Sequence, residues 1–139
     1  DELLISLEEK EKLKEGYFNE NLGHTTILLS REIKDRLRSN TLFFNVLDTA
    51  IYEISDILNR ENDKMKYIIE VNIEEDYEFI QWRDTVITIK IPIKDTKYII
   101  QLWKGLSENV RKKIKSIDAD IEEIKKINHN LSIFIEILE

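Results

Sequence analysis

The chain has 139 residues, a formal net charge of -7, 42% hydrophobic residues and no cysteine. This length suits one domain, or a domain with a short appendage, and the lack of cysteine excludes disulfides, thiolate zinc sites and cysteine nucleophiles. The negative charge disfavours binding to nucleic acid or anionic membranes unless a local basic patch is present. We find no apolar run of membrane-spanning length and no signal peptide, so we expect a cytoplasmic protein.

Three glycines and one proline are few for a chain of this length. We therefore expect short loops and no glycine-rich loop for phosphate binding. The high content of charged residues and the low content of Met and Gly favour a thermophilic, archaeal source, whereas the many asparagines argue the other way. An AT-rich genome would give the same biases.

The N-terminal part is expected to be mainly helical. A capping-box spacing predicts a short helix over Ser6–Gly16, and the β-branched, apolar stretch Thr25–Leu29 predicts a short strand. Ser30 is the expected N-cap of a helix that ends near Arg38. A longer helix is predicted over about Leu42–Leu58, where the apolar residues form a wide stripe.

A polar stretch, Asn59–Lys64, follows this helix and indicates a boundary. We therefore expect a mainly helical N-terminal segment with one short strand over residues 1–63 and an α+β segment over residues 64–139. The two segments could also form one compact domain.

After this boundary the hydrophobic period changes from helical to two, which is typical of strands. We predict a three-stranded antiparallel meander with one buried face, formed by Tyr67–Ile73, Tyr77–Trp82 and Thr85–Ile93. The residues expected on the buried face of its first and third strands are Tyr67, Ile69, Val71, Ile73, Ile87, Ile89, Ile91 and Ile93.

The C-terminal part is predicted to contain two helices and a strand. Asp95 suits the N-cap of a long helix, whose apolar stripe includes Trp103 and places it in the core. A short helix begins at Asp118 or Asp120, and the alternating stretch Leu131–Ile137 predicts a final strand. The expected fold is α+β: an antiparallel β-meander with helices packed on one face, preceded by the helical N-terminal segment with its single strand.

The sequence contains no convincing catalytic or metal-binding constellation. His24 and His129 have no second ligand at helical spacing. The acidic runs Glu74–Glu78 and Asp118–Glu123 could hold Mg²⁺, but a solvated turn and a charge-capped helix start explain them better. The serines lack the spacing of a hydrolase nucleophile elbow. We therefore expect no catalytic residues, no metal and no cofactor.

Two other groups of residues could bind nucleic acid. Four aromatic residues could stack on bases: Tyr77, Phe79, Trp82 and Trp103. A core position is the favoured interpretation for Trp103, and a core or dimer contact for the others. The basic run Arg111–Lys115 lies on the polar face of the long predicted helix. A solvated helix face explains it best, and a stripe of phosphate contacts is the alternative.

One segment resembles a known family. The stretch "TTILLSREIKDRLR" (Thr25–Arg38), followed by "SNTLFFNVLDTAIYEISDIL" (39–58), is similar to the ribbon-helix-helix family of dimeric DNA-binding regulators. The similarity rests on a short strand, a serine cap, and two amphipathic helices separated by a short break. The residues that carry it are Ile27, Leu29, Ser30, Ile33, Leu37, Val46, Ala50, Ile51 and Ile54.

The resemblance implies that two chains pair their strands and insert the ribbon into the major groove. The implied DNA contacts are Thr26, Leu28 and Arg31, with Asn40 and Thr41 at a helix start that can bind phosphate. Leu28 stands where the family usually has a polar residue, so it could contact only thymine methyl groups.

The resemblance therefore predicts a non-catalytic, homodimeric regulator that binds double-stranded DNA, in which the C-terminal segment serves as a dimerisation or effector module. The alternative is a protein-interaction or assembly domain without nucleic-acid binding, in which Thr25–Leu29 joins the same sheet as the later strands. A third and weaker hypothesis is an enzyme that uses an acidic cluster with Mg²⁺.

Overall fold

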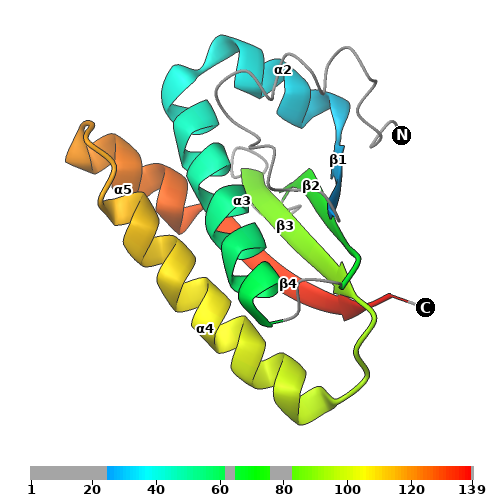
Figure 1. The fold of residues 1–139 in the computed structure, drawn as a ribbon. Helices are drawn as coiled ribbons and strands as arrows, with labels where there is room; N and C mark the ends of the chain where they lie inside the picture. Colours follow the sequence, from blue (N-terminus) through cyan, green and yellow to red (C-terminus); the bar gives the residue numbers. More distant parts are fainter. Residues whose placement is uncertain (1–24, 62–64, 76–82, 139) are drawn as a thin grey trace.

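The computed structural model describes residues 25–61, 65–75 and 83–138. The helix expected over Ser6–Gly16 and the strand expected over Tyr77–Trp82 lie outside these ranges. The described residues form a mixed α+β fold with a four-stranded sheet and four helices (Figure 1).

The four strands lie in the order in which they occur in the sequence, β1-β2-β3-β4. They are β1 (Thr25–Leu29), β2 (Tyr67–Glu75), β3 (Arg83–Ile91) and β4 (Leu131–Ile137). The pairs β1–β2 and β3–β4 are parallel, and only β2–β3 is antiparallel. The predicted antiparallel meander is therefore not confirmed, because β2 pairs directly with β3 and each outer strand joins the sheet in parallel.

Each parallel pair is connected by two helices, as parallel strands require a long crossover. The first crossover contains α2 (Arg31–Ser39) and α3 (Thr41–Glu61), and the second contains α4 (Thr96–Lys115) and α5 (Ile121–His129). The predicted caps are confirmed for three of these helices, because each cap side chain accepts hydrogen bonds from the first turn. These caps are Ser30 for α2, Asp95 for α4 and Asp120 for α5.

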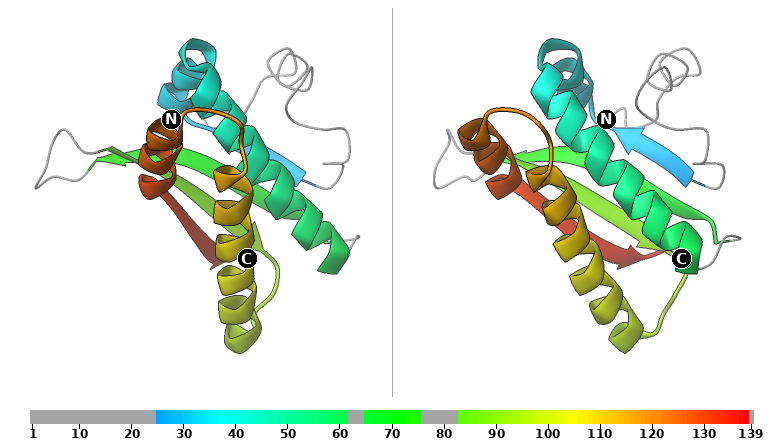
Figure 2. Two further views of the ribbon diagram at one scale, coloured as in Figure 1. Left: turned by 90° about the vertical axis from the view of Figure 1, so that its left-hand side faces the viewer. Right: turned by 60° about the vertical axis from the view of Figure 1, so that its left-hand side comes forward.

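The hydrophobic core lies between one face of the sheet and the helices. The predicted alternation is confirmed for Tyr67, Ile69, Val71, Ile87, Ile89 and Ile91, which are buried in the core. Ile73 and Ile93 are only partly buried, and Ile93 lies beyond the end of β3. Figures 1 and 2 show the helices on the same side of the sheet, and α3 packs directly against α4. The core contains residues that precede and residues that follow the predicted boundary Asn59–Lys64, so the two predicted segments share one core.

This arrangement gives the two crossovers opposite hands. The chain moves across the sheet in one direction, but β3 and β4 run opposite to β1 and β2. If both crossovers had the right hand that such units almost always adopt, their helices would lie on opposite faces. Because all four helices cover one face, one crossover departs from the rule, and no described element covers the other face of the sheet.

Candidate functional site

The first part of the outer edge of β4 is covered by two side chains of α4. The Nε1 of Trp103 donates a hydrogen bond of 2.6 Å to the carbonyl oxygen of Ile133. The Nη2 of Arg111 donates one of 2.7 Å to the carbonyl oxygen of Leu131. Both carbonyl groups point away from β3, so these bonds occupy acceptors that an added strand would need.

Arg111 also ties the end of α5 to the start of β4. Its Nη1 donates to the carbonyl oxygen of Asn128 at 2.7 Å and to Oδ1 of the same residue at 3.0 Å. The predicted solvated face holds for Lys112, Lys113 and Lys115, which are exposed, but not for the half-buried Arg111.

The predicted core position of Trp103 is wrong. Its side chain is 40% exposed and lies against β4 rather than inside the helix-sheet interface. A tryptophan N–H needs a hydrogen-bond partner, and the free carbonyl of an edge strand provides one beside apolar surface.

The outer edge of β1, in contrast, makes no such bonds within the described part of the chain. The backbone N–H of Ser30 donates to the carbonyl oxygen of Val71 on β2 at 3.1 Å. Backbone groups of successive strand residues point to alternate edges, so those of Ile27 and Leu29 point outward. Among the described residues nothing bonds to them, and the sequence TTILL contains no charge or proline to discourage pairing.

No described element covers the sheet face opposite the helices, which we call the open face, although Val86 and Thr88 on it are buried. Thr26 is exposed on it and Leu28 is half-buried. Phe134 on β4 is 51% exposed there. At its centre, Nζ of Lys90 and Oε1 of Glu70 form an ion pair of 2.9 Å. The hydrogen bond to Glu70 raises the pKa of Lys90, because it favours the charged form of the lysine.

The structure separates the five residues predicted to contact DNA. Thr26 and Leu28 lie on the open face of β1, as the alternation implied, and Arg31 is exposed at the start of α2. Asn40 and Thr41 lie beyond α2, at the start of α3, where Oδ1 of Asn40 accepts a hydrogen bond from the N–H of Phe43 at 2.9 Å. The strand that would form half of a ribbon pairs with β2 of its own chain.

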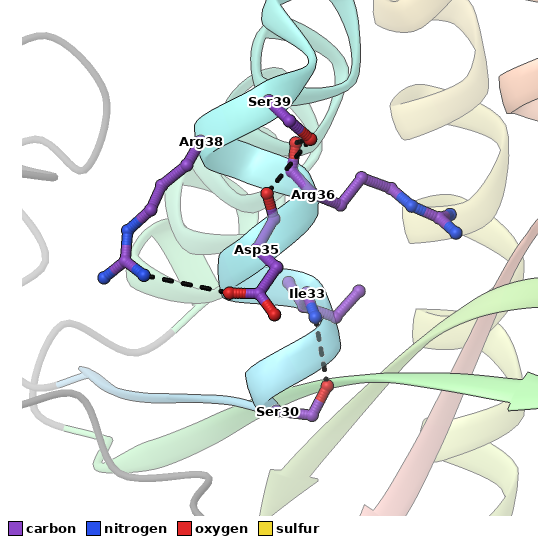
Figure 3. A network of polar contacts seen from close by, with 6 residues as sticks. All are labelled: Ser30, Ile33, Asp35, Arg36, Arg38 and Ser39. Atoms are coloured by element: carbon purple, nitrogen blue, oxygen red, sulfur yellow. Dashed lines mark hydrogen bonds and ion pairs between the residues drawn. The ribbon is translucent and has the colours of Figure 1, made fainter.

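A pocket of about 460 Å³ lies where the start of α3 approaches α5 and the first residues of β3. Its lining combines two cations, one carboxylate, three neutral polar residues and an apolar wall. The lining residues are Arg36, Asn40, Leu42, Phe43, Thr85, Glu123, Lys126, Ile127 and Asn130. The guanidinium of Arg36 lies 5.2 Å from the centre of the Phe43 ring, and Figure 3 shows Arg36 and Arg38 extending to opposite sides of α2.

Asp48 on α3 is a half-buried carboxylate whose Oδ1 has no hydrogen-bond partner among the described residues. Burial raises its pKa from 3.8 to about 7. No second acidic or basic side chain of the described residues accounts for this shift. A raised carboxylate pKa is a feature of some active sites, but Asp48 does not line the pocket.

Sequence reasoning missed Trp103, Arg111 and Thr85 as residues that matter for the edge and the pocket. The partners of Trp103 and Arg111 lie 17 to 30 positions away in the sequence, so no local pattern marks them. A tryptophan and an arginine eight positions apart on one helix, facing a strand with alternating isoleucines, are a weak signal that could have been noticed.

Comparison of the chain with protein-family models, with curated proteins and with solved structures gives no match. Within the described ranges, no group of three or more His, Asp or Glu side chains is placed to hold a metal ion. No described helix is both long and apolar enough to cross a membrane.

Proposed function

We propose that the chain is a non-catalytic assembly domain that associates by adding a strand to the outer edge of β1. The observation that carries this proposal is the contrast between the two sheet edges. Trp103 and Arg111 occupy two of the carbonyl groups on the edge of β4, whereas no described residue bonds to the outer edge of β1. Proteins normally protect exposed edge strands, so an unprotected, uncharged edge favours pairing with another chain.

A second copy of the chain is the partner that we propose. Two β1 strands can pair antiparallel about a two-fold axis without placing like charges opposite each other, because TTILL is uncharged. Five residues per chain make a small contact. We therefore expect a reversible dimer with a dissociation constant of about 1 μM to 1 mM, in the range of transient interfaces.

The DNA-binding regulator is the alternative. The exposed side chains of Thr26 and Arg31, at the two ends of the β1–α2 junction, are the observation that favours it. Against it, the major groove admits a helix or a two-stranded ribbon, and β1 is flanked by β2 of the same sheet. The net charge of -7 also opposes binding. We expect no salt-dependent binding to random duplex DNA at low ionic strength.

The assembly proposal is tested by measuring mass against concentration, by sedimentation or light scattering, for the wild type and Ile27→Pro. Proline removes the N–H of Ile27, which points outward, and leaves the hydrogen bonds between β1 and β2 in place. We expect the wild type to approach the mass of a dimer as its concentration rises and Ile27→Pro to stay monomeric.

The matched control is Ile135→Pro on β4. Ile27 and Ile135 are both half-buried isoleucines that pack against the core, and both have N–H groups that point away from the sheet. The two variants lose comparable apolar contacts but modify opposite edges. Ile135→Pro should dimerise like the wild type. Equal loss of dimer in both variants, or a wild type that is monomeric at every concentration, contradicts the proposal.

A further inference from the structure

The pocket beside the start of α3 is lined by a threonine that is almost fully buried. Thr85 is only 4% exposed, and its side chain lines the pocket. Its backbone N–H donates to the carbonyl oxygen of Asn130 at 2.8 Å, and its Oγ1 makes no hydrogen bond to the described residues. The hydroxyl is therefore available to a ligand in the pocket, as a hydrogen-bonding group that the described residues do not use.

The start of α3 adds backbone N–H donors beside the same pocket, where Asn40, Leu42 and Phe43 form part of the lining. The side chain of Asn40 accepts from the N–H of Phe43, and its carbonyl oxygen accepts from the N–H of Phe44. The N–H groups of Thr41 and Leu42 precede these and have no partner within the helix. Because α3 has 21 residues, its first turn carries the full positive end of a helix dipole.

The charges of the lining also favour an anion. Arg36 and Lys126 face a single carboxylate, Glu123, so the pocket carries a net positive charge in a chain whose net charge is -7. The wall formed by Leu42, Phe43 and Ile127 is apolar. A positively charged region and an apolar wall therefore occur together, which is typical of sites for small organic ligands.

We propose that this pocket binds a small organic anion, in which a phosphate or carboxylate contacts Thr85, Lys126 and the first N–H groups of α3, and an apolar group packs on Phe43. The start of α3 alone would be no more than a favourable dipole. The buried hydroxyl of Thr85 and the apolar wall distinguish this pocket from an ordinary helix start. The pocket lies away from the outer edge of β1, so this inference is independent of dimer formation.

Phenyl phosphate is the probe that tests the proposal, because it combines an anion with a flat apolar group. Binding to the full chain is followed by amide chemical shifts, with benzoate and phenol titrated in parallel. We expect phenyl phosphate, benzoate or both to cause saturable amide shifts at the residues that line the pocket. The compound that binds more tightly shows whether the pocket prefers a phosphate or a carboxylate. Phenol, which lacks the anion, should bind at least tenfold more weakly than the better of the two. Equal binding of phenol, or no saturable shift with any probe up to about 10 mM, overturns the proposal.

Two variants and one control locate the binding. Lys126→Gln removes a lining cation and should weaken binding about tenfold, since charge-assisted hydrogen bonds are the strong ones. Thr85→Val keeps the shape of the side chain and removes only the hydroxyl, so it should weaken binding severalfold while the protein stays folded. Lys125→Gln makes the same charge change at an exposed neighbour outside the pocket. If Lys125→Gln weakens binding as much as Lys126→Gln, the attraction is non-specific and the proposal is wrong.

Discussion

At the scale of single residues, Asp48 is the clearest case of a side chain whose position destabilises the fold. Burial raises its pKa to about 7, whereas the unfolded chain restores a pKa near 3.8. Between these values the folded state binds more protons than the unfolded state, so the contribution of Asp48 to stability falls as the pH rises. Below about pH 4 both states are protonated, and the penalty disappears.

We therefore expect Asp48→Asn to be more stable than the wild type at pH 8 by about 1–2 kcal/mol, a figure reduced because the group is half-exposed. The advantage should vanish near pH 3.5. Urea unfolding at both pH values measures it. The control is Asp56→Asn, an exposed carboxylate on the same helix that pairs with Arg60 at 3.1 Å. A gain at pH 8 as large in Asp56→Asn would show that the effect is general rather than due to burial of Asp48.

Arg111, unlike Asp48, stabilises the folded state. Its three hydrogen bonds fix the end of α5 and the first residue of β4, and removing it leaves two backbone carbonyl groups without their donor. We expect Arg111→Met to lower the free energy of unfolding by about 2–3 kcal/mol. Lys112→Met removes the same charge from an exposed neighbour and should change stability by less than about 0.5 kcal/mol. Urea unfolding of the two variants tests this, and equal effects would contradict the role of Arg111.

At the scale of the elements, helices and strands were predicted well because their signals are local. Ser30, Asp95 and Asp120 mark helix starts through bonds to residues two or three positions away, and the alternation in β2 and β3 follows directly from the burial of one face. The partner of β1 could not be predicted. A period of two shows that a strand has one buried face, but it does not show which strand lies beside it or in which direction.

Within α4, Gly105 lies in the helix interior where alanine is preferred. A Cβ atom built at this position meets no atom within 4 Å. We expect Gly105→Ala to stabilise the protein by about 0.5–1 kcal/mol, because alanine loses less backbone entropy on folding and finds free space here. Thermal or urea unfolding measures the change. Leu106→Ala, at the buried neighbouring position, should instead destabilise by about 2–5 kcal/mol. A loss of stability in Gly105→Ala would show that neighbouring atoms lie too close to position 105 to accommodate a Cβ atom.

At the scale of the whole molecule, one core serves both crossovers because all four helices lie on one face. The opposite hands of the crossovers follow from this placement of the helices. The same placement leaves the open face without a covering element among the described residues. The sequence predicted helices on one face, but it predicted a meander because consecutive strands usually pair as neighbours in antiparallel order. The candidate pocket could not be predicted from the sequence either, because Asn40, Thr85 and Lys126 lie far apart in the chain.

The proposed assembly uses the outer edge of β1 for strand addition, whereas side chains of α4 occupy part of the edge of β4. Amide hydrogen exchange at individual residues, measured at low and high protein concentration, tests this most directly. The N–H of Leu28 points towards β2 and should be protected at both concentrations. The N–H groups of Ile27 and Leu29 point outward and should gain protection only as the concentration rises. If these two groups exchange at the same rapid rate at every concentration, the edge of β1 does not pair and the account is wrong.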